Sequence, residues 1–340
     1  MEKGDTRVAA LLREELHARQ SEYLIKLDSE RVLSQRFGVG RQRMRGIIAQ
    51  LVSEGLLVKQ EGKATYIMPR VKSRYLNLLC SPGIKRNDPF YNGMLVELTN
   101  FAAKESVNII PLDLSSITQG MRSAPTLLVG RFEEGDLELL KERYPVLIAF
   151  ENYQDQDGLN QIYYNHYKIG FNAVRTLCEY GHRRLIHLTG SKLYASSNQR
   201  RDGFLNGVKK YGAEYTIVSE KMNFSGGYKT GPVVEKLARE RGYTAAFVAN
   251  DWMAVGLIQY LKEHDLAVPD EFSVIGVDNI SLSGQVSPSL TTFSLDTRLM
   301  VAEAFVLMNG LFSAPDSVAI GKKVILEPYL VVRESLKRIK

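Results

Sequence analysis

Apolar and polar positions between residues 28 and 67 follow the pattern of two short helices and a hairpin. Val32, Leu33 and Phe37 fall on one side of the first predicted helix. Asp28 and Ser29 precede this helix, and their side-chain oxygens are suited to cap a helix start. A glycine then interrupts the pattern before the next helix. The spacing therefore predicts a helix-turn-helix unit near the start of the chain.

The second predicted helix begins near Arg41 and has an apolar face and a basic face. Its apolar residues recur every three or four positions, which places them on one side. They are Met44, Ile47, Ile48, Leu51 and Val52. The opposite side carries basic and amide groups that can contact phosphates and base edges. These are Arg41, Gln42, Arg43 and Arg45. A face that meets only solvent is the alternative, but its place within an ordered helix, turn, helix and hairpin favours DNA binding.

Two short strands and one more helix complete this region. Residues 56–58 and 65–67 are rich in apolar and β-branched types and flank a glycine-containing turn. A helix over residues 5–19 would complete the apolar core. We therefore predict a small α+β domain over residues 1–68, followed by a short basic linker over residues 69–74.

From Tyr75 onward, short apolar runs alternate with amphipathic helical patterns. The runs cover Tyr75–Cys80, Val107–Leu112, Thr126–Gly130, Val146–Phe150, Arg184–Leu188, Ala245–Ala249 and Ser273–Val277. The helical patterns include Tyr91–Lys104, His166–Tyr180, Asn198–Tyr211 and Trp252–Glu263. Such alternation predicts parallel sheets covered by helices on both faces. The expected fold class is α/β, with a two-lobed domain over residues 75–340.

Polar residues follow several of the predicted strands. The pairs are Asn87-Asp88, Glu151-Asn152, Asn250-Asp251 and Asp278-Asn279. In such folds, ligands bind beyond the carboxyl ends of the strands. Asx residues at these places are often helix caps or turn formers, which is the alternative for each pair taken alone. Several such groups beside an arginine and aromatic rings are what a polyhydroxylated ligand needs.

The excess positive charge lies in the N-terminal region. The 340 residues carry a formal net charge of +6, and residues 1–75 hold 15 Lys or Arg against 9 Asp or Glu. The remainder holds 29 basic and 29 acidic residues and is neutral. A basic module joined to a neutral one is the electrostatic pattern of a phosphate-binding domain attached to a separate domain.

Other features of the composition argue against several classes of protein. Cys80 and Cys178 are the only cysteines and have no CxxC spacing, so we expect neither a disulfide framework nor a metal site. No apolar run approaches the roughly 20 residues that span a membrane, and no apolar signal sequence is visible. We therefore expect a cytoplasmic protein. No nucleophile elbow, phosphate loop or metal-binding helix motif occurs, so we expect no enzyme activity, no catalytic residue and no cofactor.

The N-terminal region resembles the winged helix of GntR-type bacterial regulators. The matching segments are Leu27-Asp28-Ser29-Glu30-Arg31, Phe37-Gly38-Val39-Gly40-Arg41, Glu54-Gly55-Leu56 and Gly62-Lys63-Ala64-Thr65. The residues to which the resemblance assigns DNA contact are Arg31, Arg41, Gln42, Arg43, Arg45, Lys63 and Thr65. The chain departs from the pattern with Asp28 for a proline, Gly40 for a capping serine and Ala64 for a glycine.

Residues 75–335 resemble the effector domain of LacI/GalR-type repressors, which is itself similar to periplasmic sugar-binding proteins. Matching segments include Asp88-Pro89-Phe90-Tyr91, Arg200-Arg201-Asp202-Gly203-Phe204, Ala249-Asn250-Asp251-Trp252 and Ser273-Val274-Ile275-Gly276-Val277-Asp278-Asn279. The residues to which this resemblance assigns effector contact are Asp88, Phe90, Asn152, Tyr164, Arg200, Phe224, Asn250 and Asp278. Leu295 and Tyr164 replace residues that are polar in many relatives, which predicts a more apolar pocket than a typical hexose site.

The residues and the two resemblances together predict a sequence-specific DNA-binding transcriptional regulator, acting as a repressor, that a small sugar or sugar derivative controls. The expected partners are double-stranded operator DNA, the effector and a second copy of the chain in a homodimer, with no membrane. The architecture is similar to that of arabinose-responsive repressors. The alternatives are a solute-binding or sugar-binding protein and a sugar-processing enzyme, neither with a role on DNA.

Overall fold

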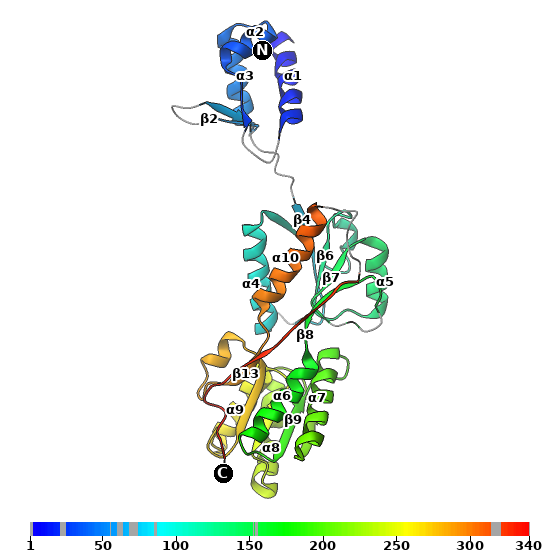
Figure 1. Ribbon diagram of the computed structural model, residues 1–340, viewed down its shortest axis with the longest axis vertical. Coiled ribbons are helices and arrows are strands. Elements are labelled where there is room, and N and C mark those ends of the chain that lie inside the picture. The colour runs from blue at the N-terminus through cyan, green and yellow to red at the C-terminus, as the bar shows by residue number, and fades with distance from the viewer. Residues whose placement is uncertain are drawn as a thin grey trace. The chain divides into compact units, whose positions relative to one another are not determined.

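Figure 1 shows the computed structural model, in which two compact units follow one another along the chain, Met1–Ser73 and Arg74–Lys340, here called the head and the body. The structure describes residues 3–20, 25–54, 56–59, 64–67, 74–84, 87–151, 153, 156–313 and 321–339. Within these ranges, no helix is both long enough and apolar enough to cross a membrane.

The described part of the head combines three helices with a small antiparallel sheet. The helices are α1 (Lys3–Arg19), α2 (Glu30–Phe37) and α3 (Arg41–Ser53). The strands are β1 (Ile25–Lys26), β2 (Leu57–Lys59) and β3 (Thr65–Ile67), in the order β1-β3-β2. This is the predicted winged helix-turn-helix. The predicted apolar face of α3 lies in the core, where Met44, Ile47, Ile48 and Leu51 are buried.

The turn between α2 and α3 shows why the two helices begin and end where they do. Ser29 caps α2, because its Oγ accepts a hydrogen bond from the backbone N–H of Val32 at 3.4 Å. Helix α2 ends at Gly38, whose φ of +65° is a backbone conformation that favours glycine. Helix α3 follows Gly40, which provides no side-chain hydrogen bond to the start of the helix.

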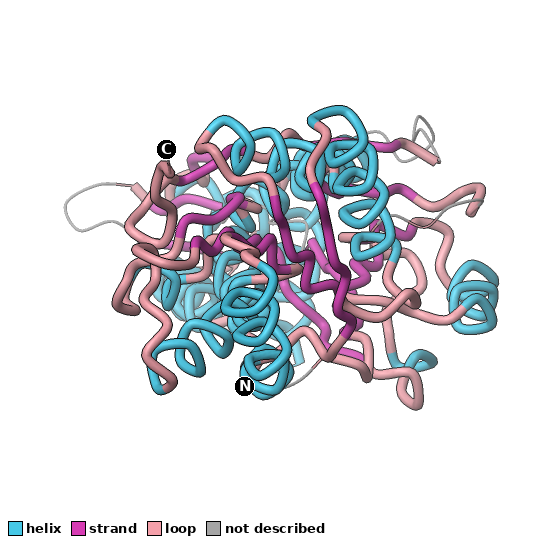
Figure 2. The backbone as a smooth tube through the Cα atoms, turned by 90° about the horizontal axis from the view of Figure 1, so that it is seen from below, coloured by secondary structure: helices cyan, strands magenta, loops and turns pink. Residues whose placement is uncertain are grey.

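The body consists of two lobes, each with a six-stranded sheet, and its strands lie among the helices that cover them (Figure 2). The first sheet has the order β14-β8-β7-β6-β4-β5. Its strands are β4 (Arg74–Cys80), β5 (Val107–Leu112), β6 (Thr126–Val129), β7 (Leu147–Ala149), β8 (Asn160–Tyr164) and β14 (Lys323–Leu326). The helices of this lobe are α4 (Pro89–Lys104), α5 (Glu134–Arg143) and α10 (Thr297–Ser313). All the described pairings within this sheet are parallel.

The second sheet has the order β10-β9-β11-β12-β13-β15, and only the pair β13 and β15 is antiparallel among its described pairings. Its strands are β9 (Arg184–Thr189), β10 (Glu214–Ser219), β11 (Ala245–Val248), β12 (Ser273–Asp278), β13 (Thr291–Ser294) and β15 (Tyr329–Val331). The helices of this lobe are α6 (His166–Glu179), α7 (Ala195–Tyr211), α8 (Phe224–Arg241) and α9 (Asp251–Glu263).

The chain passes between the two lobes three times, from β8 to α6, from β13 to α10 and from β14 to β15 (Figure 1). Hydrogen bonds join these segments to one another. The hydroxyl of Tyr164 donates to the backbone oxygen of Asp296 at 3.2 Å. The ammonium of Lys168 lies 2.9 Å from the carboxylate of Glu327. The two lobes are therefore connected through a narrow set of bonded segments rather than through a shared sheet.

Candidate nucleic-acid interface and ligand cleft

The exposed side of α3 presents the basic residues that the sequence pattern singled out. Arg41, Gln42, Arg43 and Arg45 are all exposed to solvent, and so is Arg31 on α2. Their backbone is held in place by the buried apolar face of the same helix. Of the two predicted wing residues, Thr65 is half-buried at the start of β3, and Lys63 lies outside the described residues.

One of these arginines is engaged with a carboxylate of the head itself. Arg45 donates through Nη2 and Nε to the Glu30 carboxylate, at 3.0 and 3.1 Å. This hydrogen bond and the charge of Glu30 raise the pKa of Arg45. The side chain of Arg45 remains 70% exposed, so phosphate contact requires only that Arg45 exchange one anion for another.

Asp28, which stands where the resembling family has proline, is flanked by basic groups. Its Oδ2 lies 3.7 Å from Arg19 Nη1 and 3.6 Å from Arg36 Nη1. Arg36 also pairs with Glu15, at 2.7 Å. The negative charge of Asp28 is therefore compensated within the head.

The body contains a cavity of about 700 Å³ whose lining comes from both lobes. This volume is within the range of about 300–1,000 Å³ that small-molecule sites occupy. Five of the residues predicted to contact an effector line this cavity, and we call it the cleft: Asp88, Phe90, Arg200, Asn250 and Asp278. Three aromatic residues that were not assigned to the site also line it: Tyr91, Tyr194 and Trp252.

The other predicted effector residues do not appear in the described lining of the cleft. Tyr164 is 2% exposed and bonds to Asp296 where the chain passes between the lobes. Phe224 begins α8 and is 37% exposed, but it is not among the lining residues. Asn152 lies outside the described residues. Leu295 is buried and also absent from the described lining, so neither replacement noted in the sequence makes the cleft more apolar.

Arg200 is a buried cation in the lining of the cleft, and hydrogen bonds to neighbouring residues fix its guanidinium group. It is 6% exposed, its Nη1 donates to the backbone oxygen of Ala249, and its Nε lies 3.3 Å from His166 Nδ1. Burial and the charge of Arg200 lower the pKa of His166, so the imidazole is neutral and its Nδ1 accepts this bond. Burial lowers the pKa of Arg200 itself, while Asp278 and Glu151 counteract that effect. The guanidinium is thus fixed and charged beside the carboxylates of the cleft.

Asp278 closes β12 in an uncommon backbone conformation, with φ of +113°, and the next residue, Asn279, has φ of +58°. The pKa of Asp278 lies well above its usual value. Burial is the main cause, and the Asp251 and Asp88 carboxyl groups add to it, while the Arg200 guanidinium acts in the opposite direction. Asp251 lies behind it and is fully buried. Such values of φ in non-glycine residues are concentrated at functional sites.

Asp251 is buried, is not among the residues that line the cleft, and bonds to the segments next to Asp278. Its Oδ1 accepts from the Thr292 hydroxyl at 2.5 Å, and its Oδ2 accepts from the Ile280 N–H at 3.0 Å. Burial raises the pKa of Asp251 to about 7 despite these bonds. The carboxylate therefore orders the β12 and β13 ends that carry Asp278.

Two of the predicted cleft residues are also helix caps. Asn250 accepts from the Met253 N–H at 3.0 Å at the start of α9, and its amide donates to the Met222 backbone oxygen at 3.3 Å. Asp88 accepts from the Phe90 N–H at 3.1 Å at the start of α4. The structural role considered for these side chains from the sequence is present, and the same caps place both of them in the cleft lining.

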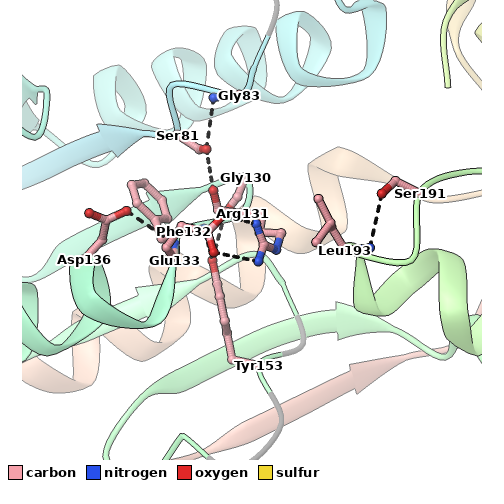
Figure 3. Close-up of polar contacts among 10 residues, drawn as sticks. All are labelled: Ser81, Gly83, Gly130, Arg131, Phe132, Glu133, Asp136, Tyr153, Ser191 and Leu193. Atoms are coloured by element: carbon pink, nitrogen blue, oxygen red, sulfur yellow. Dashed lines mark hydrogen bonds and ion pairs between the residues drawn. The ribbon is translucent and has the colours of Figure 1, made fainter. Parts of the chain in front are cut away.

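Arg131 lines the cleft on a loop that two neighbouring segments hold (Figure 3). The hydroxyl of Ser81, at the end of β4, donates to the Arg131 backbone oxygen. The hydroxyl of Tyr153 donates to Gly130 O at 3.1 Å and accepts from Phe132 N at 2.8 Å. The Arg131 guanidinium pairs with Glu133, with Nη2 to Oε2 at 2.9 Å. Arg131 is not among the site residues expected from the sequence, because no Asx-containing polar pair marks the end of β6.

Comparisons with known proteins match the two units separately. Residues 5–67 match the model of bacterial regulatory proteins of the gntR family, and residues 174–336 match a periplasmic binding protein-like domain. The HTH-type transcriptional regulator AscG of Escherichia coli (strain K12) is 30% identical over 47% of this chain and 49% of AscG. The HTH-type transcriptional regulator GanR of Bacillus subtilis (strain 168) is 24% identical over 73% of this chain and 78% of GanR.

The chain spans about half the length of AscG and of other curated relatives that it matches. Among solved structures, a LacI family transcriptional regulator from Enterococcus faecium with bound ribose has a TM-score of 0.68 and 18% identity. The match covers 78% of this chain and all of that one, and it shows a common fold. The chain therefore joins a winged helix-turn-helix domain that matches the gntR family model to a two-lobed domain that shares the fold of solved LacI-family regulators and in part matches a periplasmic binding protein-like domain.

Proposed function

We propose that this protein is a sequence-specific DNA-binding transcriptional regulator, acting as a repressor, whose body binds a sugar-like effector. The observation that carries the proposal is that one chain joins an exposed basic helix start to a cleft lined by carboxylates, one buried arginine and aromatic rings. Curated relatives named as HTH-type transcriptional regulators support the first half, and a structural neighbour with bound ribose supports the second.

In the head, Arg43 and Gln42 read base edges, and the remaining assigned residues hold phosphates. The first turn of a recognition helix enters the major groove, where an arginine fork pairs with guanine and an amide pairs with adenine. The wing residues Lys63 and Thr65 contact the DNA phosphates beside that groove. A homodimer presents two such heads to half-sites about one helical turn apart.

In the body, Arg200 donates to ligand hydroxyls, and Asp88 and Asp278 accept from them. Trp252 and Phe90 supply the flat apolar surfaces against which a sugar ring packs. The effector controls DNA binding when it favours one arrangement of the lobes over another, and a difference of about 1–3 kcal/mol is enough for ordinary regulation.

The test begins with selection of duplexes from a random pool by the purified full chain. Fluorescence anisotropy then compares a selected duplex with its scrambled version over a range of salt concentrations, with Arg41→Ala as the head variant and Arg175→Ala, an exposed arginine of α6, as the matched control. We expect the selected duplex to bind more tightly, and only Arg41→Ala to weaken binding. Equal binding of the two duplexes by the wild-type chain at every salt concentration would refute sequence-specific regulation.

A further inference from the structure

A second cavity of about 500 Å³ adjoins the cleft, and we call it the side cavity. Arg131, Glu151 and Leu193 line both spaces, so the two lie side by side. Each volume taken alone is within the range of about 300–1,000 Å³ for a small-molecule site. The cleft and the side cavity together therefore accommodate more than one ring.

The boundary between the two spaces is formed by Arg131 and Glu151 of the first lobe and by Leu193 of the second. Arg131 belongs to the loop after β6, and Leu193 to the loop after β9, and Figure 3 shows the two loops facing each other. Leu193 is 67% exposed although it is apolar. Its backbone N–H is held by the Ser191 hydroxyl at 3.3 Å. An exposed leucine opposite a fixed arginine is suited to pack against a ligand that passes between them.

The lining of the side cavity has the chemistry of a site for hydroxyl groups. It contains the amides Gln156, Asn198 and Gln199, together with the ring of Tyr153. Amide groups can donate and accept at once, as neighbouring sugar hydroxyls require. The helix that carries two of them is fixed, because Asn198 donates to the backbone oxygen of Lys192 at 2.7 Å.

The charges of the side cavity oppose an acidic ligand. Among its described lining residues, Arg131 is the one cation, whereas Glu134, Glu151 and Asp202 are acidic. Arg131 already shares its guanidinium with Glu133, and that carboxylate raises the pKa of Arg131. A carboxylate or phosphate placed here would meet an excess of negative charge, which disfavours its binding.

We propose that the effector is a saccharide of at least two units, the first beside Arg200 in the cleft and the second, without an acidic group, in the side cavity. This inference rests on the proposed function, because it names the class of effector that the same body binds. It adds that Arg131 and Leu193 determine whether the second unit enters.

The experiment uses the full chain and measures dissociation constants by calorimetry for two sets of probes. The first set is glucose, galactose, xylose and arabinose, and the second is cellobiose, maltose, lactose and xylobiose. Ala195→Trp fills the side cavity, since Ala195 lines it but does not line the cleft. Asn206→Trp is the matched control, because this exposed residue of the same helix lines neither space.

We expect at least one disaccharide to bind more tightly than every monosaccharide. Ala195→Trp should weaken that disaccharide by roughly tenfold or more and leave monosaccharides unchanged, while Asn206→Trp changes neither. Gln199→Ala provides a second variant that fills no space. It should weaken the disaccharide by roughly threefold to tenfold, as the loss of one hydrogen-bonding group does.

The outcomes separate the inference from the proposed function. If a monosaccharide binds as tightly as any disaccharide and the α7 variants change nothing, the side cavity is not a subsite, although the effector role stands. If no saccharide of either set binds, the sugar-effector proposal itself fails. An acidic derivative of the best disaccharide, with glucuronate in place of one unit, should bind more weakly than its neutral parent, and tighter binding would overturn the charge argument.

Discussion

Gly170→Ala adds one methyl group where α6 packs against α7. This group should displace the part of α7 that carries the cleft residue Arg200. A Cβ at residue 170 would stand 1.9 Å from the backbone oxygen of Arg200 and 2.8 Å from the backbone nitrogen of Phe204. Ordinary van der Waals contact begins near 3.4 Å. The helices must therefore separate by roughly 1.5 Å, and the backbone that moves is the one that carries the Arg200 guanidinium.

Overpacking of this kind costs about 1–3 kcal/mol of unfolding free energy. In a domain of this size, each kcal/mol lowers Tm by roughly 2–4 °C, so we expect a decrease of about 2–12 °C. We also expect the effector response to weaken, because Arg200 no longer keeps its bonds to His166 and to the backbone oxygen of Ala249.

Gly93→Ala is the matched control, because it makes the same chemical change in a helix without the same crowding. No heavy atom lies within 4 Å of a Cβ built at residue 93, and the residue is exposed in α4. An alanine there should stabilise the protein by about 0.5–1 kcal/mol, since glycine is unfavourable inside helices. Thermal denaturation with and without the best-binding saccharide measures both effects. A Gly170→Ala protein that melts and responds as wild type would refute the argument from packing.

Three further predictions concern single side chains. Arg43→Ala should lose about 1–3 kcal/mol of discrimination between a selected and a scrambled duplex, and equal losses on both would refute base contact. Glu30→Gln should release Arg45 for phosphate contact, so that the slope of log affinity against log salt steepens by about one in anisotropy titrations; an unchanged slope would contradict this. Asp251→Asn should remove a pH dependence of stability. Because folded Asp251 keeps its proton up to about pH 7 and the unfolded chain releases it near pH 4, unfolding free energy falls as pH rises through that window. Parallel Tm profiles of wild type and Asp251→Asn from pH 4 to 8 would sink this reading.

The head was predictable from the sequence because its local signals agree with one another. The apolar spacing of α3, the serine before α2 and the glycine after it each point to the same boundaries, and the structure contains them. The position of Arg45 against Glu30 was not predictable, because the two residues are 15 positions apart and meet only through the packing of α2 on α3.

The body was predictable in its alternation but less so in individual elements. Helix α8 is not among the helices named from the sequence, and it contains Pro232 and several glycines, which have low intrinsic helix propensity. The structure gives a tertiary reason for these glycines. A Cβ at Gly227 would stand 1.8 Å from the Met253 backbone oxygen, so α8 needs glycine to approach α9 this closely. Packing between helices overrides the local preference there.

Some residues of the cleft could be predicted from their local sequence, and others could not. Asp88, Asn250 and Asp278 follow strands, and their place in the lining agrees with the rule that ligand sites gather at strand ends. Arg131 also follows a strand, but its type gave no sign of this role. What fixes it is the bonding of its loop by Ser81, which follows β4, and by Tyr153, which follows β7, because these two strands flank β6 in the folded sheet.

The arrangement of charges in the cleft gives a physical reason for an effector to change the relation between the lobes. Asp88 and Glu151 belong to the first lobe and Asp278 to the second, and burial together with the Asp88 carboxylate of the opposite lobe raises the pKa of Asp278, which reflects repulsion between carboxyl groups across the cleft. Arg200 offsets part of this repulsion. A ligand with many hydroxyl groups can donate to carboxylates of both lobes at once and bind the closed arrangement better than the open one. That difference in affinity is what regulation requires, since a ligand that binds both arrangements equally shifts neither.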